Sequence, residues 1–299
     1  MTQEIYITHY YHSGFSIAYE DLLFIFDYWR GENKEVTPEY QIQPAQLVRF
    51  RKVFVFISHE HVDHLDPIVF TWKDAAPVSY YVSSDMPVGT RGKRMAPGDM
   101  QTLEEGITVK AYDSTDLGVS FLLDLKGTHI FHAGDLNFWH WRDESSLRDI
   151  EEAEQEFQKA VQPLTHEKID VAFFPVDPRL GSMFEAGANY FILSVKPRLL
   201  IPMHYFHRTD IILEYARTAS CRTTEVLAMP GIGDCIGIRL DDSGFMDVFF
   251  PKENPAFKNT SDSSELNSQE LLENIEGDNP FAESDLPLSQ LADNDEKED

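Results

Sequence analysis

The stretch that decides the fold runs from Lys52 to His64 and reads KVFVFISHEHVDH. Residues 53–57 form an unbroken run of β-branched and aromatic side chains, which is typical of a strand buried on both faces. The run continues directly into a segment that holds three histidines and one aspartate within six residues, 59–64. A buried strand that ends in such a cluster predicts a functional loop at the edge of a sheet.

The polar residues of this loop are natural ligands of a divalent ion, because imidazole and carboxylate both suit Zn²⁺. Side chains alternate along an extended segment, so His59 and His61 point the same way. The loop can then curl and turn Asp63 and His64 toward a second ion. Without a metal, these groups would be gathered at a partly buried place with no compensation for their lost hydration. We expect one or two ions, zinc first, with manganese or iron as alternatives.

The rest of the first 250 residues predicts an α/β architecture with two sheets and outer helices. The pattern of apolar residues and turn residues predicts strands at 5–10, 15–18, 22–26, 52–58, 78–82, 107–111, 119–125, 129–132, 170–175, 199–202, 225–227 and 236–240, and helices near 44–50, 144–161, 185–195 and 209–218.

Three segments carry a resemblance to a known family. The loop His59-x-His61-x-Asp63-His64 is similar to the signature of the metallo-β-lactamase-fold hydrolases. Residues 131–135, ending in Gly-Asp, resemble a later motif of that family, and so do residues 202–205, which contain a histidine at a strand end. Residues 11–15 and 23–27 are similar to the N-terminal hairpin of the lactonase-like branch, the relatives of ascorbate-6-phosphate lactonase.

The resemblance implies an αββα sandwich of two mixed sheets flanked by helices, with residues 1–250 as the hydrolase domain. It implies that Asp135 bridges two ions, that Asp63 is also the catalytic residue, and that a metal-activated hydroxide attacks the substrate. The implied metal ligands are His59, His61, Asp63, His64, Asp135 and His204.

One departure from the family pattern concerns the first ion. The family supplies a third histidine between the first motif and the Gly-Asp, and the corresponding turn here has Ser114 near that place. Asp116 is the nearest residue able to bind a metal well, and His140 is a second possible replacement. A third possibility is that the first ion is bound weakly and the centre is effectively mononuclear.

Other residues have less definite roles. His12 and Trp139 are possible contacts on the substrate side, with a structural role in the core as the alternative for each. Asp177 either orients a ligand histidine or only forms an Asp-Pro turn.

The charge is uneven. The formal net charge is −26, and residues 251–299 contribute −11 of it from 14 acidic residues and three lysines. This segment is too polar to offset its chain entropy, so an acidic disordered tail is predicted there. The remaining −15 argues against direct affinity for nucleic acid or anionic membranes.

The sequence has no run of about 18 apolar residues, so no membrane-spanning helix is predicted. The two cysteines and the lack of a signal-like start favour the cytoplasm.

These observations favour a metal-dependent hydrolase acting on a small ester, lactone or phosphorylated metabolite. The alternatives are a phosphodiesterase or nuclease of the same fold, and a non-catalytic metal-binding protein with a degenerate first site.

Overall fold

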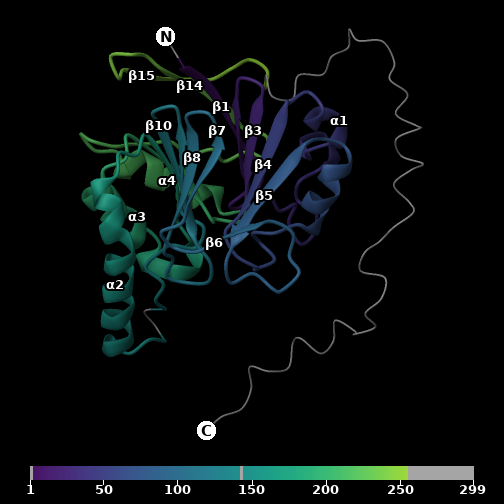
Figure 1. Ribbon diagram of the computed structural model, residues 1–299. Helices are drawn as coiled ribbons and strands as arrows, with labels where there is room; N and C mark the ends of the chain where they lie inside the picture. Colours follow the sequence, from purple (N-terminus) through teal and green to yellow (C-terminus); the bar gives the residue numbers. More distant parts are fainter. Residues whose placement is uncertain (1–2, 142–143, 255–299) are drawn as a thin grey trace. The chain divides into compact units, whose positions relative to one another are not determined.

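Two mixed β-sheets pack face to face in the computed structural model, which describes residues 3–141 and 144–254 (Figure 1). The first sheet has the strand order β15-β14-β1-β2-β3-β4-β5-β6. Its strands are β1 (Gln3–His9), β2 (Phe15–Tyr19), β3 (Leu22–Phe26), β4 (Lys52–Ile57), β5 (Val78–Ser83), β6 (Lys93–Met95), β14 (Cys235–Leu240) and β15 (Met246–Phe249).

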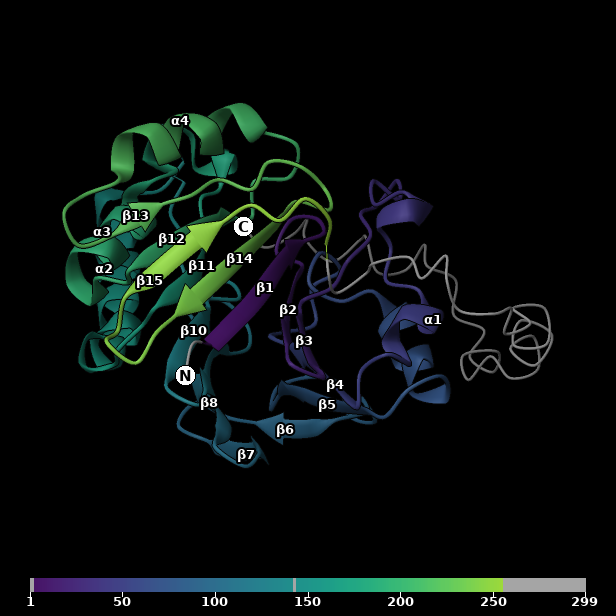
Figure 2. The ribbon, with the colours of Figure 1, turned by 90° about the horizontal axis from the view of Figure 1, so that it is seen from above.

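The second sheet has the strand order β13-β12-β11-β10-β9-β8-β7 (Figure 2). Its strands are β7 (Met100–Glu104), β8 (Ile107–Tyr112), β9 (Ser120–Leu125), β10 (Thr128–His132), β11 (Val171–Pro175), β12 (Leu199–Met203) and β13 (Glu225–Val226). The helices are α1 (Pro44–Leu47), α2 (Leu147–Val161), α3 (Ala186–Val195) and α4 (Thr209–Ala219), with 3-10 turns η1 (Pro38–Tyr40), η2 (Pro67–Asp74), η3 (Gln162–His166) and η4 (Pro178–Met183).

The helices cover the outer faces of both sheets. α2, α3 and α4 lie beside the second sheet, and α1 lies beside the first, where η2 also packs (Figure 1). The predicted αββα class is therefore confirmed, and the expected strands and helices are present. The short strands β6, β7 and β15 were not predicted. Among the described residues, the helices are too short or too polar to cross a membrane.

The apolar run of β4 is explained by its two buried faces. Phe54 and Phe56 point into the core between the sheets, whereas Val53, Val55 and Ile57 pack against α1 and η2 on the outside. A strand with a core on each side has no polar face, so the alternation of a half-exposed strand is missing.

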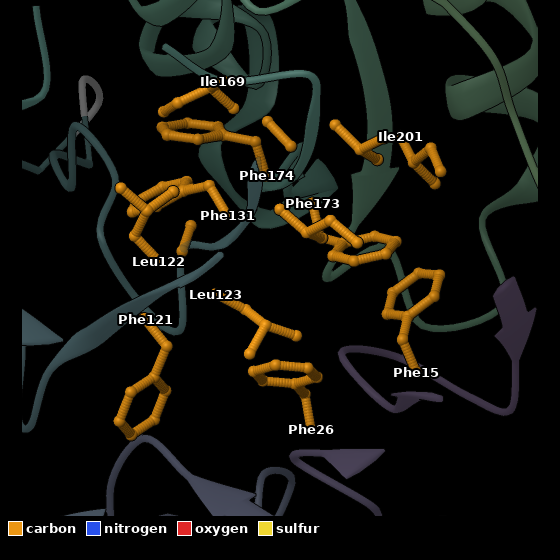
Figure 3. Packing of buried hydrophobic residues seen from close by; sticks show 14 of the residues in the cluster. Phe15, Phe26, Phe121, Leu122, Leu123, Phe131, Ile169, Phe173, Phe174 and Ile201 are labelled. Carbon is orange, nitrogen blue, oxygen red and sulfur yellow. The ribbon is translucent and has the colours of Figure 1, made fainter. Parts of the chain in front are cut away.

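Aromatic rings join the two sheets across the central core (Figure 3). Phe15 of the first sheet stacks on Phe173 of the second, with ring centroids 4.2 Å apart. The rings of Phe26 and Phe121 also meet across the core, with centroids 6.4 Å apart and their planes tilted by 55°. Such pairs add to the stability that the buried area already provides, and they hold the strand ends of both sheets in fixed positions.

The strands that matter for function end at one edge of the sandwich. β3, β4 and β5 are parallel to one another in the first sheet, and β10, β11 and β12 are parallel in the second. The loops that follow parallel strands lie together at their carboxyl ends, which brings loops distant in the sequence to a common place.

At the other end of these strands in the second sheet, a buried carboxylate links the amino ends of the neighbouring strands β10, β11 and β12. Asp170 accepts a hydrogen bond from the backbone N–H of His129 at 3.0 Å, and Arg198 Nη1 lies 3.3 Å from its other oxygen. Burial alone would raise the pKa of Asp170, but hydrogen bonds from His129 and the charge of Lys168 outweigh burial and lower the pKa to about 2.

We expect Asp170→Asn to lower the free energy of unfolding by about 1–3 kcal/mol, because buried donors lose a charged acceptor. The folded pKa lies below the ordinary value of 3.8, so the difference from wild type should be complete above about pH 4 and shrink as the pH falls toward 2. Urea unfolding of the metal-free proteins measures it. The exposed Asp74→Asn is the control, and an equal loss in both variants would contradict the assignment.

Candidate metal centre

Histidines and carboxylates from several loops converge at the edge of the sandwich where the parallel strands of both sheets have their carboxyl ends. The loop after β4 supplies His59, His61, Asp63 and His64, the turn after β10 supplies Asp135, and His204 follows β12 directly. Together with His12 and Asp116, these side chains place their donor atoms in three groups, each within 4.8 Å: His12, Asp63, His64 and His204; His59, His64 and Asp135; and His61, Asp116 and Asp135. The cluster is therefore able to hold a metal ion.

Asp135 is at the middle of the cluster, and its two oxygens face different histidines. Oδ1 lies 2.9 Å from His64 Nε2 and 3.1 Å from His204 Nε2. Oδ2 lies 3.2 Å from His59 Nε2 and 3.8 Å from His61 Nδ1. We name the place bounded by Asp63, His64, His204 and Oδ1 the inner position. The place bounded by His59, His61, Asp116 and Oδ2 is the outer position.

The chemistry of the donors at the inner position fits a divalent cation. Asp135 Oδ1, His64 Nε2 and His204 Nε2 are buried, and although Oδ1 lies within 3.1 Å of both nitrogens, none of the three atoms makes a hydrogen bond of good geometry. Buried polar atoms without partners are costly, and imidazole nitrogen with carboxylate oxygen is a ligand set for zinc or other first-row ions. A cation between these atoms would satisfy all three.

His64 is oriented by a carboxylate behind it. Its Nδ1 lies 2.8 Å from Asp27 Oδ2, and Asp27 in turn accepts hydrogen bonds from the Ser58 N–H at 2.8 Å and the Ser58 hydroxyl at 2.6 Å. Ser58 Oγ also lies 2.8 Å from His59 Nδ1. These contacts leave Nε2 of both rings directed at the centre, the arrangement by which a ligand histidine gains basicity and a fixed tautomer.

His204 is oriented in the same way by Asp177. Asp177 Oδ2 lies 2.8 Å from His204 Nδ1, and Oδ1 accepts the backbone N–H of Arg179 at 2.8 Å. Both roles considered for Asp177 from the sequence are thus present in one side chain. Burial would raise its pKa, but hydrogen bonds from His204 and Arg179 outweigh burial and lower it to about 2, so Asp177 is ionised at neutral pH.

The turn that departs from the family pattern reaches the outer position. Asp116 belongs to the same group of donors as His61 and Asp135. The turn passes close to β4 at Gly118, where φ is +82° and an added Cβ would lie 1.9 Å from the Ser58 carbonyl oxygen. Only glycine fits this approach, and it allows Val119 N–H to donate to that carbonyl at 3.0 Å.

His140 does not lie with the metal-binding groups formed by the described residues. Its ring stacks on Phe138 with centroids 4.2 Å apart, and Nδ1 lies 3.2 Å from the Phe138 carbonyl oxygen. Trp139 borders the centre instead: its Nε1 donates to the Asp135 carbonyl at 2.7 Å, and its ring centroid is 5.5 Å from that of His204.

His12, for which a substrate-side contact and a structural role were both considered, lies beside Asp63. The side chain is completely buried, and its Nε2 lies 3.3 Å from Asp63 Oδ2.

Asp27 and Ser58 were not predicted to take part in the site. The only signal was their place directly after the buried strands 22–26 and 53–57, where a polar side chain needs a partner.

Comparisons with known proteins agree with this fold. No protein-family model matches the chain. A "UPF0173 metal-dependent hydrolase" of Pyrobaculum neutrophilum is 23% identical over 211 residues, which are 65% of this chain and 81% of the relative.

Two solved structures are similar over most of their length. Igni18, described as a novel metallo hydrolase from Ignicoccus hospitalis, has a TM-score of 0.58 at 17% identity and covers 78% of this chain and 98% of its own. The metallo-β-lactamase fold protein YhfI of Bacillus subtilis has a TM-score of 0.53 at 13% identity and covers 79% and 99%. The chain has the metallo-β-lactamase fold, and the lactonase-like branch stays a prediction.

We expect Asp177→Asn to weaken metal binding about 10- to 100-fold, because His204 loses the carboxylate that orients it. Competition with a chromophoric chelator measures the affinity for Zn²⁺. Asp210→Asn is a matched control, since Asp210 also pairs with a nearby arginine, Arg208, but on the surface. Unchanged zinc affinity in Asp177→Asn would show that the carboxylate does not support the site.

Proposed function

We propose that the chain is a metal-dependent hydrolase that acts on a small ester, lactone or phosphate ester. One observation carries the proposal: each oxygen of Asp135 faces its own pair of histidines, so one carboxylate adjoins two metal positions. The similarity to a relative named as a metal-dependent hydrolase supports it. Fold alone would not, since one fold serves many functions.

The residues hold the two positions rigidly. A divalent ion bound in them would lower the pKa of a water and polarise a carbonyl or phosphoryl oxygen of the substrate. His64 and His204 are each fixed by an ionised carboxylate, and Asp135 sets the spacing between the inner and outer positions. The ligand atoms therefore need little reorganisation when an ion binds or a substrate arrives.

Asp63 is the residue proposed to handle the proton of the attacking water. Its side chain is 19% exposed, compared with 5% for Asp135, so it can contact solvent at the centre. Burial would raise its pKa, but the contacts with His12 and His64 lower the pKa below the ordinary range. The carboxylate is then ionised at neutral pH and can accept a hydrogen bond from water.

Asp116 is proposed to complete the outer position in place of the third histidine. Its carboxylate adjoins His61 and Asp135, which supports an active centre with two ions over a non-catalytic one with a degenerate site. Two imidazoles with two carboxylates suit zinc, manganese or iron. The carboxylates near the centre would repel a long polyanion, so a small substrate is favoured over a nucleic acid.

We expect Asp63→Asn to reduce turnover by about 10²- to 10⁴-fold, the range of a lost general base. The substrates are a p-nitrophenyl ester, a lactone and bis-p-nitrophenyl phosphate, assayed with Zn²⁺ or Mn²⁺. Glu60→Gln, an exposed change in the same loop, should keep wild-type activity. Full activity of Asp63→Asn would exclude the role, and no activity of the metal-loaded wild type on a broad panel would favour a binding protein.

Asp116→Ala should reduce the number of tightly bound ions from about two to about one per chain, because the outer position loses a carboxylate. Elemental analysis after gel filtration in metal-free buffer measures the count. Asp113→Ala changes an exposed carboxylate of the same turn and should retain both ions. If both variants bind as much metal as wild type, Asp116 is not a ligand.

A further inference from the structure

His12 lies in the tight turn between β1 and β2, and its backbone is held in a strained conformation. Its φ is +55°, a left-handed value that is uncommon for residues other than glycine. The turn is closed by Gly14 N–H donating to the Tyr11 carbonyl at 2.8 Å, and the His204 N–H donates to the His12 carbonyl at 3.2 Å. Strained residues persist where the surroundings enforce them, which often marks a functional position.

The His12 ring has unsatisfied nitrogen atoms. The side chain is 0% exposed, and neither Nδ1 nor Nε2 makes a hydrogen bond of good geometry, although Nε2 lies 3.3 Å from Asp63 Oδ2 on the side of the metal centre. On one side the ring packs against Phe206, with centroids 4.1 Å apart, and the ring of Trp29 lies at 5.9 Å. These apolar neighbours offer no hydrogen-bond partner, so a partner for the ring nitrogens of His12 has to lie on the side of the metal centre.

On that side His12 adjoins the inner position. Its ring centroid is 3.9 Å from that of His204 and 5.8 Å from that of His64. One of its ring nitrogens is within 4.8 Å of donor atoms of Asp63, His64 and His204. A completely buried ring cannot reach a substrate that enters from solvent, whereas a cation among these four side chains would be within its reach.

We propose that His12 is a ligand of the ion in the inner position, together with Asp63, His64 and His204. This inference rests on the metal centre of the proposed function and not on the reaction it performs. The inner position then has three imidazoles in a buried setting. The outer position has two, with His61 43% exposed and Asp116 also exposed. The two positions are therefore unequal, and a single ion fills the inner one first.

X-ray absorption at the zinc edge tests the ligand count directly. The metal-free protein is loaded with one equivalent of Zn²⁺, and the outer-shell scattering gives the number of imidazoles on the ion. We expect three in wild type and two in His12→Asn, since asparagine tolerates the left-handed backbone. Two imidazoles in wild type, or three in both proteins, would overturn the proposal.

Thermal unfolding with and without Zn²⁺ separates a ligand from a structural residue. Binding to the folded state raises the melting temperature by an amount that grows with the logarithm of the affinity. A lost ligand should therefore shrink the rise caused by zinc, because the zinc affinity becomes at least about tenfold weaker. A structural role would lower the melting temperature equally with and without zinc, and that result would contradict the proposal.

His9→Ala is the matched control. His9 is a buried histidine of β1, and its Nδ1 lies 3.2 Å from the Gly231 carbonyl oxygen, outside the groups of possible ligands formed by the described residues. Its zinc-dependent rise should equal that of wild type. Both experiments measure zinc binding and not turnover, so they test the ligand role of His12 separately from the proposed hydrolase activity. Three imidazoles in an inactive protein would contradict only the proposed function, and two imidazoles in an active hydrolase would contradict only the role of His12.

Discussion

The buried carboxylate of Asp135 is the constraint on which the rest of the site depends. Burial opposes its charge, and nearby His64 and His204 compensate for it and lower its pKa well below the ordinary range. A buried charge is tolerated only where such partners are held in place. The strands that end at this edge must therefore deliver imidazoles from separate loops to one carboxylate, and any loop that shifts leaves that charge uncompensated.

Packing in the cores of the two sheets fixes the strand ends that carry these imidazoles. β4 is apolar on both faces and is fixed by a core on each side, so the loop that begins at Ser58 starts from a defined position. Asp27 and Asp177, each at the end of a buried strand, then fix the rings of His64 and His204. The ligand geometry thus follows from packing in the core, which is transmitted to the rings by two hydrogen-bonded carboxylates.

The part of this arrangement that is local in sequence could be predicted. The run 53–57 and the motif after it are contiguous, so their pattern indicates a buried strand and a metal-binding loop. β6 and β15 were missed because they are short and carry few buried residues. The placement of His12 and Asp27 beside a loop more than 30 residues away depends on strand order and register, which no local pattern contains.

The centre draws its donors from both sheets, with His59, His61 and His64 after β4 of the first and Asp135 and His204 after β10 and β12 of the second. An ion held there would be a cross-link between the two halves of the sandwich. Separation of the sheets at this edge would require metal–ligand bonds to break, so the sandwich would open from its opposite edge first. The same ion that serves the chemistry would then also set the order in which the fold comes apart.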